Sequence, residues 1–350
     1  MNKIFIIFIS VLLLFGCGEK KEKNTDSGKT NNTSASSAEN LKNAPVENID
    51  GLVLIKYKFE KGKTYNYKMT TVSEDNQSIH VRDTVLNQIV HQNIVYKISF
   101  EPKNIDADSV TELNCNVTSV RLDADANGQT FSYESGNTVD SASQIRYAQY
   151  AALVNNPFGV RVSKQGEILE LFRVDKIVNK YLTIKGYADS VTSAEKEAMR
   201  KDISESSLKP LITQIIRKFP DHTVGKDSTW SIKQQPEPFM IFTLNNTTTF
   251  KLSNLQKQND NKLAVIDASM DSKVTGKTTS TQRGVSYKFK KPTASGNGQF
   301  HFNITDGVMQ SAKTHTEMNI EFSMEANTPQ GKQKGSRSEN VKNTYEIERL

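Results

Sequence analysis

The most specific chemical pattern in the chain is an acidic segment of its first half, Asp123-Ala124-Asp125-Ala126-Asn127-Gly128, with Glu134 in the twelfth position. Oxygen-bearing side chains alternate with small residues, and the glycine in sixth place permits a sharp turn. This is the spacing of a calcium-binding loop. The sequence therefore offers four candidate calcium ligands, which are Asp123, Asp125, Asn127 and Glu134.

The residues on either side of this segment favour a different interpretation. Residues 118–122 and 131–133 alternate as strands do, whereas a calcium loop of this type lies between two helices. The dipeptide Asn127-Gly128 is also typical of a two-residue β-hairpin turn. A hairpin turn is therefore the favoured interpretation, and a calcium site is the alternative.

No other residue pattern indicates a catalytic site. The five histidines form no paired metal-binding motif, and the sequence has no nucleophile elbow, phosphate loop or dinucleotide-binding glycine motif. The 45 basic residues are scattered rather than gathered in a stripe with aromatic residues, which argues against nucleic acid as a partner. We therefore predict a protein that is not an enzyme and that carries no cofactor.

The N-terminal residues have the pattern of an export signal. Lys3 precedes an apolar run that is too short to span a bilayer, and the run ends in Leu14-Phe15-Gly16-Cys17. This tetrapeptide resembles the lipobox of bacterial lipoproteins, with Phe15 where a small residue is usual. The resemblance implies a signal peptide over residues 1–16, acyl chains such as palmitate on Cys17, and the lipid bilayer as a partner through acylated Cys17.

Residues 17–50 are predicted to be this lipidated cysteine and a flexible polar tether, because residues 18–50 include no aromatic side chain. The chain has two cysteines, so acylation of Cys17 leaves Cys115 without a disulfide partner. Cys115 shares one side of an alternating run with Leu113 and Val117, which predicts a buried core thiol.

Most of the remaining sequence predicts antiparallel strands, several of them longer than the usual five or six residues. Strands of this length suit a curved sheet or an incomplete barrel. The predicted fold class is therefore mainly β, a β-rich α+β fold. The alternating runs are residues 52–59, 65–69, 89–100, 110–122, 239–257, 262–276, 298–304, 308–324 and 343–350, the first two being expected to pair as a hairpin.

A helical segment interrupts the strands over residues 174–219. Apolar side chains recur at helical spacing from Val174 to Leu182 and again from Leu208 to Phe219, and Thr192 with Glu195 forms a capping-box pair. The β-rich body, residues 51–350, would then consist of two halves, 51–173 and 220–350, which the helices join. The two halves are candidates for related repeats.

This layout resembles uncharacterised β-rich lipoproteins of the Bacteroidota cell envelope, and residues 224–230 resemble a segment that recurs in that group. The resemblance implies a lipid-anchored protein of the outer membrane, on either its periplasmic or its cell-surface face, and no particular activity. Five Asp-Ser or Asp-Thr triplets also resemble the acceptor for O-glycosylation in exported proteins of this group, although such residues also cap helices and turns. The candidate acceptors are Thr84, Ser109, Ser141, Ser190 and Ser228.

These observations predict a membrane-anchored cell-envelope lipoprotein that binds or scaffolds another envelope component without catalysis. The alternative is a carrier of a hydrophobic, lipid-like ligand, held in an unclosed barrel with the helices of residues 174–219 as a lid. A third interpretation is an envelope hydrolase with no recognisable motif. The expected partner besides the bilayer is thus a hydrophobic ligand or another envelope protein.

Overall fold

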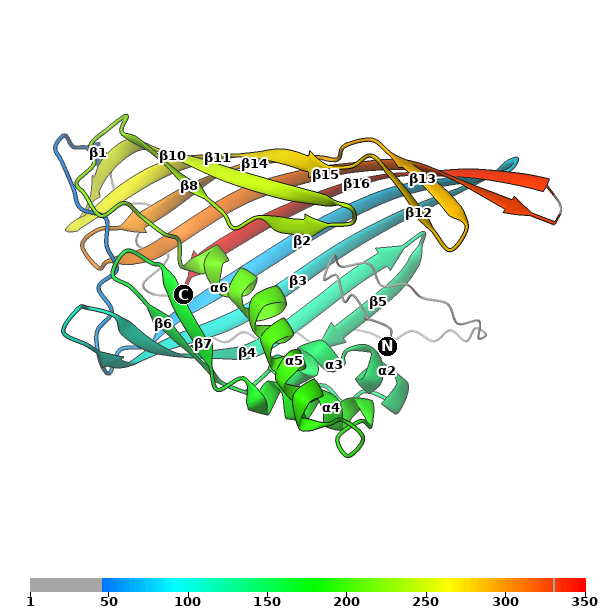
Figure 1. Cartoon of the computed structure of the whole chain (residues 1–350). Helices are drawn as coiled ribbons and strands as arrows, with labels where there is room; N and C mark the ends of the chain where they lie inside the picture. The colour runs from blue at the N-terminus through cyan, green and yellow to red at the C-terminus, as the bar shows by residue number, and fades with distance from the viewer. Residues whose placement is uncertain (1–45, 330) are drawn as a thin grey trace.

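A computed structural model describes residues 46–329 and 331–350. The predicted signal peptide, Cys17 and most of the predicted tether lie outside these described residues. Strands account for 58% of the residues and helices for 15%, and the described strands form one open, antiparallel sheet of 16 strands (Figure 1). The predicted fold class, mainly β with long strands in a curved, unclosed sheet and a helical segment in mid-chain, is confirmed.

In the middle of the sheet, a strand from the first part of the described chain lies beside the last strand. The order of the sheet is β1-β10-β11-β14-β15-β16-β2-β3-β4-β6-β7, with β5 beside β4, β8 and β9 beside β10, and the β12–β13 hairpin beside β15. The last strand, β16, therefore pairs with β2, and all the paired strands run antiparallel. The strands are β1 Val46–Asn48, β2 Tyr65–Val81, β3 Thr84–Ile105, β4 Thr111–Ala126, β5 Gln129–Glu134, β6 Phe158–Val162, β7 Ile168–Phe172, β8 Thr229–Lys233, β9 Glu237–Phe239, β10 Phe242–Gln258, β11 Asn261–Gly276, β12 Thr279–Gln282, β13 Val285–Phe289, β14 Thr293–Asn303, β15 Val308–Thr328 and β16 Gly331–Arg349.

The helices lie together against one end of the sheet (Figure 1). Both predicted apolar stripes are buried in α4 and α6, and the predicted capping box is present at the start of α5. Among the described residues, no helix is both long and apolar enough to cross a membrane. The helices are α2 Ser141–Arg146, α3 Ala148–Leu153, α4 Asp175–Lys185, α5 Ser193–Ile203, the π-helix η1 Ser204–Leu208 and α6 Lys209–Ile215.

The hairpin predicted for residues 52–59 and 65–69 is wrong. Residues 52–59 make a single β-bridge, between Val53 and Val224, and do not pair with β2. The backbone N–H of Tyr57 donates to Lys164 instead, and that of Lys58 donates to Gly307. The alternation reflects the burial of Ile55, Tyr57 and Phe59, and a segment that packs across the end of the sheet buries alternate side chains just as a strand does.

One large core fills the space between the sheet and the helices. It combines side chains of ten strands with those of α3, α4, η1 and α6. On β2, the inward-facing Tyr65, Tyr67 and Met69 belong to this core, and the strand then continues for twelve more residues. The concave face of the sheet therefore extends well past the core.

Candidate functional site

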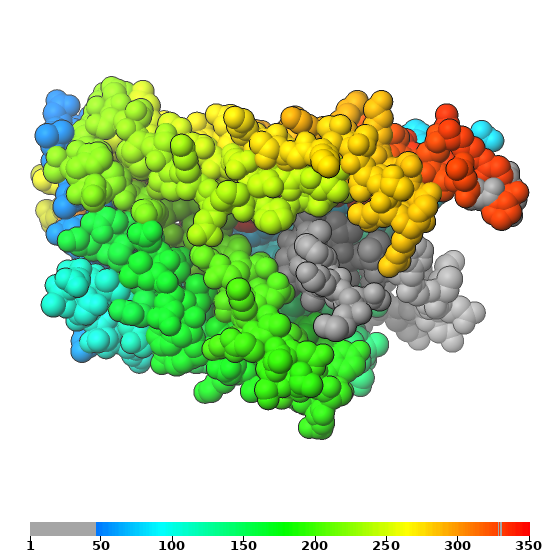
Figure 2. Space-filling view, viewed as in Figure 1, coloured from blue at the N-terminus to red at the C-terminus, as the bar shows by residue number. Residues whose placement is uncertain are grey.

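Beyond the core, the concave face carries a band of side chains that we call the inner lane. Side chains two residues apart share one face of a strand. On each strand, the residues of the lane therefore follow the core residues at intervals of two, away from the core. Figure 2 shows the surface hollowed between the upper edge of the sheet and the helices. The inner lane consists of Thr71, Ser73, Asp75 and Gln77 on β2, Gln92 on β3, Arg337, Glu339, Asn343 and Tyr345 on β16, Thr314, Thr316, Met318 and Ile320 on β15, Met270 and Ser272 on β11, Asn246 on β10, and Trp230 and Ile232 on β8.

Polar groups are buried in the inner lane to an unusual degree. Nine polar or charged residues are buried in the described part of the chain, and six of them belong to the lane. Polar residues of these types mostly lie at the surface of proteins. The six are Ser73, Asp75, Gln77, Gln92, Thr314 and Glu339.

Several of these groups have no hydrogen-bond partner. Eight buried side-chain polar atoms in the described residues are unpaired, and seven of them face the concave side. The exception is Asn116 Oδ1, which lies on the outer face of β4. Buried polar atoms in native proteins are nearly always paired, so a cluster of unpaired atoms on one face calls for an explanation. The seven are Asp75 Oδ1, Gln92 Oε1, Arg217 Nε, Trp230 Nε1, Asn246 Oδ1, Ser272 Oγ and Arg337 Nε.

The part of the lane farthest from the core holds two acids and one base on the adjacent strands β2 and β16. Arg337 donates to Glu339 Oε2 at 2.7 Å, and Gln77 Nε2 donates to Asp75 Oδ2 at 2.9 Å. Burial raises the pKa of the Asp75 carboxyl, against the opposing effects of Gln77 and Arg337. Burial likewise raises the pKa of Glu339, and the negative charge of Asp75 adds to this effect while Arg337 opposes it.

Arg217 lies at the end of the lane that adjoins the core. The chain leaves α6 with Ile216 and Phe219 buried, and the backbone N–H of Arg217 donates to the Tyr57 hydroxyl at 2.8 Å. The guanidinium lies over the Phe300 ring, 5.0 Å from its centroid, and Nη2 donates to Gln214. Burial lowers the pKa of Arg217 to about 10, so the side chain stays charged at neutral pH.

The predicted calcium ligands lie on a β-hairpin. Asn127 and Gly128 both have positive φ, 52° and 85°, and connect β4 to β5 as a two-residue turn. Asp123 accepts from Arg121 Nε at 2.9 Å, Asp125 accepts from the Gly128 backbone, and the Asn127 oxygen accepts from the Ile89 backbone. Glu134 is the cross-strand partner of Arg121. In the described part of the chain, no three His, Cys, Asp or Glu side chains are grouped to hold a metal ion. Calcium binding here stays a prediction.

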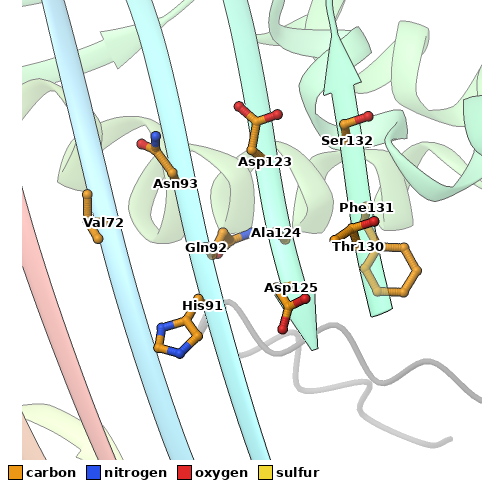
Figure 3. Close-up of a pocket in the computed structure, with 10 residues that line it drawn as sticks. All are labelled: Val72, His91, Gln92, Asn93, Asp123, Ala124, Asp125, Thr130, Phe131 and Ser132. Carbon is orange, nitrogen blue, oxygen red and sulfur yellow. The ribbon is translucent and has the colours of Figure 1, made fainter. Parts of the chain in front are cut away.

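Two of these acids line a shallow hollow on the outer face of the sheet. Its volume is about 450 Å³, and its lining includes Asp123, Asp125 and His91 (Figure 3). The two carboxylates point in opposite directions along β4 in Figure 3, and His91 Nδ1 lies 4.0 Å from Glu74 Oε2. A second outer hollow, of about 620 Å³, lies farther along the sheet and includes Lys290, which pairs with Glu321 at 2.7 Å.

The other residues singled out from the sequence lie apart from the lane. Cys115 is fully buried in the core and burial raises the pKa of its thiol, which confirms the predicted core position. Thr84, Ser109, Ser141 and Ser190 are exposed. Ser228 is half-buried and its hydroxyl accepts from the Gly225 backbone at 3.0 Å. Glycosylation at these five positions stays a prediction.

Comparison with protein families gives one assignment. A family model described as "Family of unknown function (DUF6263)" matches residues 108–309, which is more than half of the chain. The chain belongs to this family. The matched region begins just before β4, includes all the described helices and ends at the second residue of β15. Strands β2, β3 and β16, which bear most of the polar residues of the lane, lie outside the matched region.

Comparisons with individual proteins add little to this. No curated protein matches the chain. Solved structures that align with it include OccK2 (OpdF) of Pseudomonas aeruginosa, at 6% identity over 81% of this chain and 98% of the other, with a TM-score of 0.18. An outer membrane channel from Pseudomonas putida F1 aligns at 6% identity over 84% and 100%, with a TM-score of 0.17. OccK7 (OpdD) of Pseudomonas aeruginosa aligns at 6% identity over 83% and 100%, with a TM-score of 0.19. Identities and TM-scores this low carry no argument about fold or function.

Proposed function

We propose that this DUF6263 protein is a lipid-anchored binding protein of the bacterial cell envelope, without catalytic activity, whose inner lane holds an elongated ligand. One observation carries the proposal. Six lane side chains, together with Arg217 at its end, present buried hydrogen-bonding atoms that no part of the described chain satisfies. Burying such an atom without a partner costs about 1–3 kcal/mol, and a bound ligand that pairs with it removes that cost.

The chemistry of the unpaired atoms describes what such a ligand must offer. Three of them, on Asp75, Gln92 and Asn246, are acceptors, so the ligand has hydroxyl or amide N–H donors along its length. The acceptors lie on β2, β3 and β10, on both sides of the lane. A compound that reaches all three must extend across the lane rather than occupy a single pocket.

The lipid anchor rests on the N-terminal sequence. The apolar run that ends in Leu14-Phe15-Gly16-Cys17 supports acylation of Cys17 and an outer-membrane location, on a face that the motif does not specify. Replacing Cys17 with serine is expected to abolish incorporation of an alkyne-labelled palmitate and to release the protein from the membrane fraction. Labelling that persists in Cys17→Ser would contradict the anchor but not the ligand site.

A search for co-purified compounds tests the ligand site. The full chain is purified from its native membrane, and organic extracts are analysed by mass spectrometry. We expect a compound that is present with the native chain and depleted in Gln92→Leu/Asn246→Leu, which removes two lane acceptors. Asn116→Leu is the matched control, because it removes the unpaired acceptor on the outer face. Equal recovery from all three chains, or no compound from any, would contradict the proposal.

A carrier of a hydrophobic ligand is the second candidate, and one observation favours it. Four apolar side chains lie on the concave face of β8, β11 and β15, next to polar lane residues of the same strands; they are Ile232, Met270, Met318 and Ile320. The helices of residues 174–219 do not act as the predicted lid. Ile177, Leu182, Leu211 and Ile212 pack into the core, which Trp230 and Ile232 of the lane also contact, so the helices fill the concave face at that end of the lane. A lipid-like ligand would therefore lie in the lane.

A further inference from the structure

Arg217 is a half-buried cation that forms no ion pair with a carboxylate in the described part of the chain. Besides burial, the groups with the largest effect on its pKa are the hydroxyls of Tyr57 and Tyr345. Its Nε–H is buried and finds no acceptor among the residues that the structure describes. The other arginines on the concave side differ from it, because Arg337 pairs with Glu339 and Arg349 pairs with Asp306, each at 2.7 Å. A buried guanidinium normally has such a partner, because leaving it unpaired is costly.

A second unpaired donor lies near the same end of the lane. Trp230 Nε1 is buried without an acceptor, and the indole stacks on Phe250 with ring centroids 5.6 Å apart. Phe250 in turn contacts Phe300, the ring on which Arg217 lies. The two unpaired N–H donors thus flank one aromatic cluster. The unpaired acceptors of the described residues, on Asp75, Gln92 and Asn246, lie farther from the core, so this end selects for a group that accepts hydrogen bonds.

The strands between these donors carry small side chains. Across the sheet from Trp230, the row continues through Phe250, Ala268, Gly298 and Thr314 to Tyr345. Ala268 and Gly298 project little above the sheet, and the hydroxyls of Thr314 and Tyr345 complete the far side. From this row, apolar side chains continue outward through Met270 and Met318 to Ile320. Met318 and Ile320 belong to a second, smaller apolar cluster with Phe239 and Leu244.

We propose that this end of the lane is an anion site, which takes the carboxylate or phosphate monoester head of an amphipathic ligand. Arg217 and Trp230 donate to the head group, a hydrocarbon part of the ligand lies along Met270, Met318 and Ile320, and its hydroxyl or amide donors face the acceptors of the lane. The proposal rests on the inner lane being a ligand site and names the chemical class of that ligand. A guanidinium suits both head groups, since its planar donors match carboxylate and phosphate oxygens.

The test uses Trp230 as its own reporter, because it is the only tryptophan in the chain. The full chain in phosphatidylcholine vesicles is titrated with 11-(dansylamino)undecanoate, and energy transfer from Trp230 to the dansyl group is measured. The methyl ester of the same probe, which has no carboxylate charge, is the control ligand. Dodecanoate and dodecyl phosphate then compete with the bound probe, and the better competitor shows which head group the site takes.

We expect the acid to bind at least tenfold more tightly than its ester. Arg217→Met should abolish that difference, and Arg217→Lys, which keeps the charge, should retain most of it. Arg173→Met is the matched control, because Arg173 lies 4.8 Å from the Phe172 ring, outside the lane, and its replacement should change neither affinity. Circular dichroism and the midpoint of thermal unfolding establish that each variant is folded.

Two results would overturn the inference. They differ in whether the lane is still a ligand site. Equal affinity for acid and ester, unchanged by Arg217→Met, would refute the anion site while the lane remained a ligand site. No saturable energy transfer with either probe would refute an amphipathic ligand altogether. In that case, the co-purification experiment on Gln92→Leu/Asn246→Leu would decide whether the lane binds any ligand.

Discussion

At the scale of single residues, the buried acids of the inner lane make stability depend on pH. Burial raises the pKa values of Asp75 and Glu339, so the folded protein holds these protons more tightly than the unfolded chain does. The stabilisation from this pair is therefore complete below the ordinary carboxyl pKa and is lost as the pH rises through the raised values.

Replacing Asp75 with asparagine tests this dependence. The variant keeps an acceptor for Gln77 but has no charge to bury. Its free energy of unfolding at pH 7 should exceed that of the native chain by on the order of 1 kcal/mol, and the difference should vanish near pH 4. Urea denaturation at both pH values measures it. Asp123→Asn, on the outer face, serves as the control, and a less stable Asp75→Asn at pH 7 would contradict the prediction.

Gly166 lies in a tight turn and also lies close to the backbone of Arg217. Its φ of +86° suits the turn between β6 and β7, but a Cβ atom there would also lie 2.1 Å from the carbonyl oxygen of Arg217. Gly128 has a similar φ, +85°, with open space around it. Gly128→Ala should therefore cost about 1–2 kcal/mol of backbone strain, and Gly166→Ala about 3 kcal/mol or more.

Chemical denaturation of the two variants measures this difference. Gly166→Ala should also weaken binding of the anionic probe, because the backbone of Arg217 has to move. Equal losses of stability in the two variants would show that the turn strain alone matters at Gly166 and that the close approach relaxes without cost.

At the scale of elements, the helical segment acts as a plug. Ile212 of α6 is completely buried among core side chains, whereas Ile145 of α2 remains 46% exposed. Truncating Ile212 to alanine should lower the free energy of unfolding by about 2–5 kcal/mol, because it leaves a cavity where helix and sheet meet. The same truncation at Ile145 should change it by less than about 0.5 kcal/mol.

Thermal or urea unfolding of Ile212→Ala and Ile145→Ala distinguishes a plug from a loosely docked lid. If both truncations have small effects, α6 contributes little to the core, and the helices behave as a lid over the concave face. A large loss for Ile212→Ala alone supports the plug.

At the scale of the whole molecule, stability should decrease along the sheet. The core contacts the first residues of β2 and the second half of β3, whereas the far ends of these strands expose Val81, Val85 and Leu86. Hydrogen exchange at neutral pH should therefore be slowest for residues 65–71 and 94–100, and much faster near the β2–β3 turn. Uniform protection along both strands would contradict this gradient.

The sequence alone determined the class of the fold and several of its elements. Long alternating runs required long strands, because a period of two places every second side chain on one face. The spacing from Val174 to Leu182 and the Thr192–Glu195 pair specified α4 and the start of α5 from local contacts alone. Asn127-Gly128 specified its hairpin turn in the same way.

Only the tertiary structure decided where the candidate site lies. Residues 331–342 are largely polar and lack an apolar alternation, so the first half of β16 could not be predicted, although it supplies Arg337 and Glu339. The polar run Ser73, Asp75 and Gln77 has the right period, but the sequence does not say that it faces a buried lane. Residues 52–59 alternate as a strand and form none. The physical reason is the same in each case, because periodicity specifies which side chains share a face, whereas the distant strands and helices that pack against that face determine whether it is buried, paired or open to a ligand.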